Sequence, residues 1–156
     1  MRRKDREKEE AFALQVLEHC EYATMATVDS KGMPYCVPLS PVLVGKTIYF
    51  HGALAGKKLE NIKEHPQVCV SAVGHTKRVP EEFTTEFESA IVFGRCQVVE
   101  EEEEKTMALM AICEKYAKSH LHQAKEAIER SISRTAVIKV EIQSITGKAK
   151  VCPPKG

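Results

Sequence analysis

Residues 49 to 66 read Tyr-Phe-His-Gly-Ala-Leu-Ala-Gly-Lys-Lys-Leu-Glu-Asn-Ile-Lys-Glu-His-Pro, and they join an apolar strand end to a short helix. The turn holds Gly52 and Gly56, and glycine lets a backbone approach a ligand closely. Lys57 and Lys58 follow at the start of the helix, where free N–H groups favour an anion. From these residues alone, the stretch indicates either a phosphate socket or a plain strand–turn–helix with solvated lysines.

The composition is that of one globular domain. Of the 156 residues, 43% are hydrophobic and 29% are charged, which is ordinary for a chain that buries a single core. A net charge of +1 gives no overall field that would draw the chain to nucleic acid or to an anionic membrane. No apolar run reaches the ~18 residues of a membrane span, and the charged N-terminus is no signal peptide. We expect a single cytoplasmic domain over residues 1–156, with neither nucleic acid nor membrane as partner.

The cysteines and histidines show no pattern that indicates chemistry of their own. Six cysteines are spread along the chain without metal-binding spacing. Several fall on apolar faces, where free cysteine behaves as a small hydrophobic residue. No Gly-x-Ser-x-Gly elbow for a nucleophilic serine is present. We therefore expect reduced thiols, no metal site and no catalytic triad.

Strand patterns dominate the middle of the chain and helix patterns its flanks. Short β-rich runs bounded by turn residues predict six strands. They cover residues 22–28, 34–44, 47–51, 67–73, 87–99 and 135–142. Helices are expected over residues 5–20, after the lysine pair as far as Pro66, over 100–118 and over 120–131. Because most consecutive strands are joined by tight turns, the pattern predicts a mainly β fold, a closed antiparallel barrel with flanking helices.

Irregular segments and strand breaks are also predicted. Residues 74–86 are polar and read as a long loop of the kind that is often functional. The chain from residue 143 to 156 reads as a polar, mobile tail, and residues 1–20 as an N-terminal helical segment. Gly94 predicts a bend in a barrel strand, and Pro38 with Pro41 predicts an edge or a bend.

Seven segments resemble, in order and spacing, the segments of one known superfamily. They are residues 2–7, 22–29, 32–39, 49–53, 56–58, 65–70 and 87–94. Each motif is weak alone, but together they span nearly the whole chain. The sequence is similar to the FMN-binding split barrels of the pyridoxamine phosphate oxidase-like superfamily, and within it to the nitroimidazole-resistance (Nim) group. The resemblance implies a six-stranded antiparallel split β-barrel.

The resemblance also implies an FMN site. In these proteins the glycine-lysine turn holds the FMN phosphate, a neighbouring strand passes the ring edge, and a polar residue touches the flavin, often across a dimer interface. The positions carried over are Val37, Pro38, Leu39, His51, Gly52, Gly56, Lys57, Lys58 and Ser89. Oxidase relatives have Arg-Lys where this chain has Lys-Lys, which keeps the charge but loses the guanidinium fork. The last strand, ending Ser-Ile-Thr-Gly-Lys at residue 148, lacks the substrate residues of a true pyridoxamine phosphate oxidase.

By resemblance, the protein is expected to be an FMN-dependent oxidoreductase and a homodimer whose cofactor sites are made by both chains. It could reduce nitro-aromatic compounds with electrons from NAD(P)H, and His51 is the catalytic candidate because histidine can supply a proton near neutral pH. Read without the resemblance, His51 is more readily a structural histidine. The alternatives are a flavin- or haem-binding carrier or sensor without turnover, and a dimeric scaffold whose cofactor site has decayed.

Overall fold

The computed structural model describes residues 2–152, and its centre is one antiparallel sheet of eight strands. The strands are β1 (Glu7–Lys8), β2 (Ala23–Val28), β3 (Pro34–Leu39), β4 (Val42–Val44), β5 (Thr47–Gly52), β6 (Gln67–Val79), β7 (Thr84–Val98) and β8 (Ala136–Lys150). The helices are α1 (Glu10–His19), α2 (Lys57–Glu64), α3 (Glu102–Tyr116) and α4 (Ala124–Ser131), and single 3₁₀ turns cover Lys4–Arg6, Pro80–Glu82, Lys118–Gln123 and Ile132–Arg134. The spatial order is β3-β2-β6-β7-β8-β5-β4, with β1 beside β8.

The sheet curls around a hydrophobic core, to which the strands contribute roughly every second side chain. Helix α1 packs on the inner side of the sheet, against this core. The centre of the core contains Met25, Phe50, Val70 and Val92, all with 0% exposure. The cluster also contains other inward-facing apolar side chains of the strands, Val16 and Leu17 of α1, and Leu59 and Ile62 of α2. This arrangement confirms the predicted split barrel.

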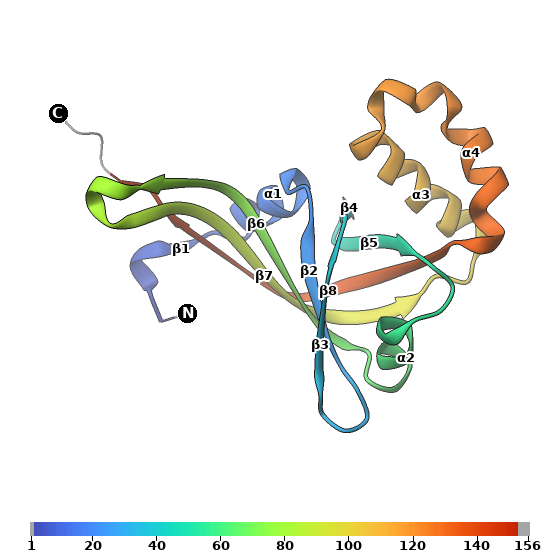
Figure 1. The fold of residues 1–156 in the computed structure, drawn as a ribbon, viewed down its shortest axis with the longest axis horizontal. Helices are drawn as coiled ribbons and strands as arrows, with labels where there is room; N and C mark the ends of the chain where they lie inside the picture. Colours follow the sequence, from blue (N-terminus) through green and yellow to red (C-terminus); the bar gives the residue numbers. More distant parts are fainter. Residues whose placement is uncertain (1, 153–156) are drawn as a thin grey trace.

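A second apolar cluster lies outside the barrel. Helices α3 and α4 pack over β4, β5 and the start of β8, where Tyr49 and Val137 meet Leu109, Ile112 and Ile128. Figure 1 shows these two helices together beyond β5. Since the side chains of β5 alternate in direction, the strand serves the barrel core with one face and this cluster with the other.

The predicted loop over residues 74–86 is wrong. Strand β6 runs on to Val79 and β7 begins at Thr84, so the segment is a strand hairpin with a register shift between Val73 and Thr76 and a turn at its tip. The sequence is polar here because this hairpin reaches away from the barrel into solvent, where Figure 1 shows it beside the end of β8. Its backbone groups are paired across the ladder, which requires no apolar alternation.

The expected tail and the expected start of the first helix also need correction. Strand β8 continues to Lys150, which pairs with Phe87, and the remainder of the expected tail beyond Cys152 lies outside the described residues. Helix α1 begins at Glu10, because Glu7 and Lys8 form a strand opposite Lys148 and Gly147. Both differences come from strand pairing between distant parts of the chain, which local patterns do not contain.

The main path of the sheet has seven strands rather than the predicted six. The predicted strand over residues 34–44 is divided at Pro41 into β3 and β4, which form the two opposite edges of the sheet. The proline prediction is thus confirmed as both an edge and a break, since Pro38 lies in edge strand β3. Gly94 is confirmed as an irregular point, because the register of β7 against β8 shifts between Phe93 and Gly94.

Within residues 2–152, none of the helices combines the length and the apolar character needed to cross a bilayer.

Candidate functional site

The amino end of α2 is built around Gly56. This residue caps the helix with φ = +136°, a backbone conformation that residues with a Cβ rarely adopt. The N–H groups of Leu59 and Glu60 both bond to the carbonyl of Gly56. Lys57 and Lys58 therefore occupy the first helical positions, where backbone N–H groups have no partner within the helix. Leu59 is buried in the barrel core and holds this end of α2 against the sheet.

Lys58 directs its ammonium group to the end of β5. A Cβ placed on Gly52 would lie 3.1 Å from Lys58 Nζ, so the bare glycine makes the room in which the half-buried lysine lies. The two predicted residues are thus close together although they belong to different elements. A cation and the N–H groups of the first two helical residues lie at this end of α2, which is an arrangement that fits a phosphate.

Lys57 is directed to a different neighbour. Its Nζ lies 3.4 Å from Oδ2 of Asp29, in the turn between β2 and β3. The other carboxylate oxygen of Asp29 accepts the N–H groups of Lys31 and Met33, each at 2.9 Å. The hydrogen bond from Met33, with smaller contributions from Lys31 and Lys57, lowers the pKa of Asp29. Asp29 is therefore a fixed anion beside the lysine pair, and the sequence indicated only its role in the turn.

His51 and β3 frame the same region. The His51 side chain is exposed at the end of β5, where its residue pairs with Val137 of β8. Edge strand β3 presents the predicted ring-edge residues: Val37 pairs with Met25, Pro38 with Thr24, and Leu39 with Ala23. Helix α2 packs against both β2 and β3, and its Lys58 lies beside Gly52 of β5, so the helix connects β3 with the end of β5. Whether each predicted position contacts a cofactor stays a prediction.

Ser89 lies elsewhere in the chain. It pairs with Val73 of β6 and Lys148 of β8. The segment that follows α2 meets β7 at Cys96, whose N–H bonds to the carbonyl of Pro66. Ser89 is seven residues before that point, roughly 24 Å along an extended strand. Within one chain, Ser89 therefore lies far along β7 from the point where the segment after α2 meets this strand.

The outer face of β6 and β7 carries exposed apolar side chains. Ala90 and Val92 of β7 are completely buried, whereas Phe93 is 57% exposed and Val73 of β6 is 50% exposed. Because α1 packs on the inner side of these strands, it leaves this outer face open. Exposed apolar patches of this kind are typical of surfaces that bind a partner.

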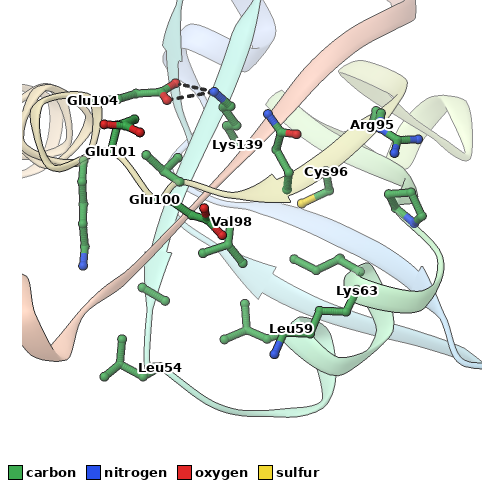
Figure 2. A pocket seen from close by; sticks show the side chains of 16 residues that line it. Leu54, Leu59, Lys63, Arg95, Cys96, Val98, Glu100, Glu101, Glu104 and Lys139 are labelled. Carbon is green, nitrogen blue, oxygen red and sulfur yellow. Dashed lines mark hydrogen bonds and ion pairs between the residues drawn. The ribbon is translucent and has the colours of Figure 1, made fainter.

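A pocket of about 780 Å³ lies between α2, the start of α3 and the adjoining ends of β7 and β8. None of the nine predicted positions lines it. Figure 2 shows Glu104 and Lys139 joined across its wall, with Arg95 and Lys63 on the other side. Glu104 accepts hydrogen bonds from Lys139 at 2.8 Å and from Tyr49 at 2.9 Å. These contacts anchor α3 to the barrel, which is a structural role. Because the pocket contains none of the predicted positions, we place the candidate site at the lysine pair.

The comparisons with known proteins agree with this geometry. The family described as pyridoxamine 5'-phosphate oxidase matches residues 9–149, and the chain belongs to that family. The family expected from the motifs is thus confirmed. No curated protein sequence matches the chain.

Several solved structures share the fold. A candidate 5-nitroimidazole antibiotic resistance protein from Bacteroides thetaiotaomicron is 24% identical, with a TM-score of 0.75, covering 91% of this chain and 84% of that chain. A conserved hypothetical protein from Mycobacterium tuberculosis has a TM-score of 0.81 at 14% identity, covering 99% and 96% of the two chains. An FAD and haem binding protein from Mycobacterium smegmatis has a TM-score of 0.70 at 18% identity, covering 96% and 74%. The resemblance to the nitroimidazole-resistance group is confirmed at the level of the fold.

Proposed function

We propose that this protein binds FMN, with the phosphate at the amino end of α2, and that it acts as an oxidoreductase. The observation that carries the proposal is the position of Lys58 Nζ beside Gly52, which has no side chain. Lys57 and Lys58 are adjacent in the first turn of α2. A phosphate dianion matches this combination of cations and free N–H groups. Membership of the pyridoxamine 5'-phosphate oxidase family supports a flavin phosphate rather than an unrelated anion.

The residues of the chain would divide the work of binding. Lys58 and the first N–H groups of α2 would hold the phosphate, and edge strand β3, from Val37 to Leu39, would lie along the ring. The exposed His51 would face the ring or a molecule stacked on it. When bound, FMN would supply hydride or electron transfer, while the protein supplies position and charge.

A homodimer would complete the site. Ser89 lies far along β7 from the point where the segment after α2 meets this strand, and the outer face of β6 and β7 exposes Val73 and Phe93. A second copy packed on this face could bring its own Ser89 to the flavin. A specific interface should bury more than ~1,000 Å². Sedimentation at micromolar concentration tests this, and a stable monomer would contradict the shared site.

The proposed activity is reduction of a nitro-aromatic compound with electrons from NAD(P)H. Its support is the family together with the structural likeness to a candidate 5-nitroimidazole resistance protein. The first test is the absorbance spectrum of the purified protein after addition of FMN. The second is oxidation of NAD(P)H with and without a nitroimidazole. Flavin absorption together with nitroimidazole-dependent turnover would support the proposal.

The decisive binding test compares FMN with riboflavin, which lacks the phosphate. The double variant Lys57→Ala/Lys58→Ala should weaken FMN binding by on the order of tenfold per lysine, because charge-assisted hydrogen bonds contribute about 1.5–3 kcal/mol each. Riboflavin binding should change little. An equal loss for both ligands would mean that the lysines serve the fold rather than a phosphate.

The competing proposal is a flavin or haem carrier that does not turn over. It is favoured by the similarity to an FAD and haem binding protein and to a haem storage protein of Vibrio cholerae. The spectrum separates the cofactors, because haem gives a Soret band and flavin does not. Flavin binding without NAD(P)H turnover would favour the carrier over the enzyme.

A further inference from the structure

Two buried polar residues connect α2 to the hairpin of β2 and β3. Thr27 is 0% exposed and Asn61 is 1% exposed, and they are the buried polar residues among those that the structure describes. Asn61 Nδ2 donates to Thr27 Oγ1 at 2.9 Å, and Thr27 Oγ1 donates to the carbonyl of Tyr35 at 3.3 Å. The hydroxyl therefore uses its single donor within the hairpin and accepts from the helix.

A second link joins the same two elements at the surface. Lys57 pairs with Asp29 at 3.4 Å, while Asn61 pairs with Thr27. Lys57 and Asn61 are four residues apart, about 6 Å along a helix. Thr27 and Asp29 are two residues apart, about 7 Å along a strand. The two links thus form the rungs of a ladder, one buried and one exposed, between α2 and the β2–β3 hairpin.

Two contacts constrain the rotation of α2 more than a single contact can. A single contact would let α2 turn about its own axis, whereas two contacts on the same helical face hold its rotation. Lys58 lies next to that face, so the rotation of α2 decides whether its Nζ reaches Gly52. The rotation also decides where the free N–H groups of the first turn point.

We propose that the Thr27–Asn61 hydrogen bond positions the phosphate-binding end of α2 and thereby sets the preference of the protein for a phosphorylated flavin. Asn61 and Thr27 are positioning residues, since they act through Lys58 and the first turn of the helix. This inference rests on the proposed function. It goes beyond that function by assigning selectivity to residues that do not themselves reach the ligand.

The physical reason is that a buried polar pair contributes geometry more than stability. Replacing one partner leaves the other unsatisfied and costs stability, but replacing both by apolar groups of similar shape can be nearly neutral. A well-packed apolar pair would keep the helix in place without requiring one rotation. Stability and selectivity can therefore be separated by experiment.

Four variants of the full chain provide that separation, each assayed for FMN affinity, riboflavin affinity and thermal midpoint. Thr27→Val should lower the midpoint by roughly 3–8 °C, because it leaves the Asn61 amide unsatisfied. The double variant Thr27→Val/Asn61→Leu should recover most of that loss. Its FMN dissociation constant should nevertheless stay about five- to tenfold above wild type, with riboflavin within about twofold, which corresponds to a weakened rather than a lost charge-assisted contact.

The other two of the four variants serve as controls. Thr27→Ser keeps the hydroxyl and should restore both the midpoint and the preference for FMN. Ile128→Val removes a methyl group beneath α4, far from the ladder, and should lower the midpoint without changing the FMN-to-riboflavin ratio.

The possible outcomes separate this inference from the proposed function. A wild-type protein that prefers FMN, with a double variant that keeps the same preference, would overturn the positioning role alone. A Thr27→Ser variant that behaves like Thr27→Val would overturn it as well. A wild-type protein that binds FMN and riboflavin equally would overturn both the proposed phosphate site and this inference.

Discussion

The ammonium group of Lys57 lies 3.4 Å from the carboxylate of Asp29, while that of Lys58, the next residue, lies over Gly52. Adjacent helical residues point about 100° apart, so the two side chains reach different neighbours. One lysine has an anionic partner within the protein and the other is directed to the proposed phosphate position. The Lys-Lys pair is therefore not a pair of equivalent charges.

We expect Lys58→Ala to weaken FMN binding more than Lys57→Ala does, by about threefold to tenfold in dissociation constant. The reason is that Asp29 competes with a phosphate for Lys57 but not for Lys58. Asp29→Asn should strengthen FMN binding and enlarge the effect of Lys57→Ala. Fluorescence titration with FMN measures all three. Equal losses for the two lysines, unchanged by Asp29→Asn, would contradict unequal roles.

Gly52→Ala should leave the fold intact and weaken FMN binding. The new Cβ would come 3.1 Å from Lys58 Nζ, and a flexible side-chain end gives way more readily than backbone does. The cost should therefore appear in the phosphate contact and scarcely in the thermal midpoint. The double variant Gly52→Ala/Lys58→Ala is the control. It should bind FMN no more weakly than Lys58→Ala, and additive losses would show that Gly52 acts independently of the lysine.

Gly94→Ala should have the opposite profile. A Cβ at this position would overlap the backbone carbonyl of Glu141 and lie 2.7 Å from Val140 Cγ1. Backbone on the neighbouring strand cannot move without breaking the β7–β8 ladder at its register shift. We expect a loss of more than about 2 kcal/mol in the free energy of unfolding. Urea denaturation measures it, and an unchanged midpoint would mean that the bulge relaxes freely.

His51→Ala should retain FMN and the dimer but lower turnover with an electron acceptor. The side chain is exposed at the end of β5, so its removal leaves no cavity, and a histidine there could give a proton to a bound acceptor. His75→Ala, on the exposed arm of β6, is the matched control and should leave turnover unchanged. Loss of thermal stability and of bound flavin together, with turnover per flavin preserved, would assign His51 a structural role.

The Tyr49–Glu104–Lys139 contact should give the protein two pH limits. The hydrogen bond from Lys139, and then that from Tyr49, lowers the pKa of Glu104 from 4.5. Burial, and then the hydrogen bond to Glu104, raises the pKa of Tyr49 from 10.0 to about 12. A carboxyl group whose pKa is lowered by folding stabilises the fold at pH values above its pKa in the unfolded chain, and this stabilisation is lost in acid. A tyrosine whose pKa is raised by folding stabilises the fold at pH values below its pKa in the unfolded chain, and this stabilisation is lost as the pH rises.

Thermal midpoints of two variants check these limits. The difference between wild type and Glu104→Gln should be largest near neutral pH and shrink as the pH falls below the value of 4.5. The difference between wild type and Tyr49→Phe should shrink as the pH rises from 10.0 towards about 12. Differences that stay constant across these ranges would show that the contact does not anchor α3.

Much of the fold could be predicted because local patterns state it directly. The β-rich runs over residues 22–28 and 47–51 predicted strands that the structure contains. The turn at Gly56 and the stop at Pro66 bounded α2 closely. The residues of the lysine pair, and the family to which the chain belongs, could also be inferred from the order of the motifs.

The predictions from local sequence patterns were wrong where pairing with distant strands determines the secondary structure. The polar arm from Gly74 to Glu86 and the end of β8 look like loop and tail, but each is strand because its neighbours pair with its backbone. Backbone pairing is indifferent to side-chain polarity when both faces meet solvent. No local pattern could reveal it.

By itself, the sequence determined the mainly β architecture, the short helix with two lysines at its start, and membership of the family, because these depend on neighbouring residues and on motif order. Only the tertiary structure decided that Lys57 faces Asp29, that Lys58 faces Gly52, and that Asn61 bonds Thr27 beneath them. Those relationships depend on how a helix is rotated against a hairpin some thirty residues away in the chain. That rotation is set by packing and buried hydrogen bonds, which exist only once the chain has folded.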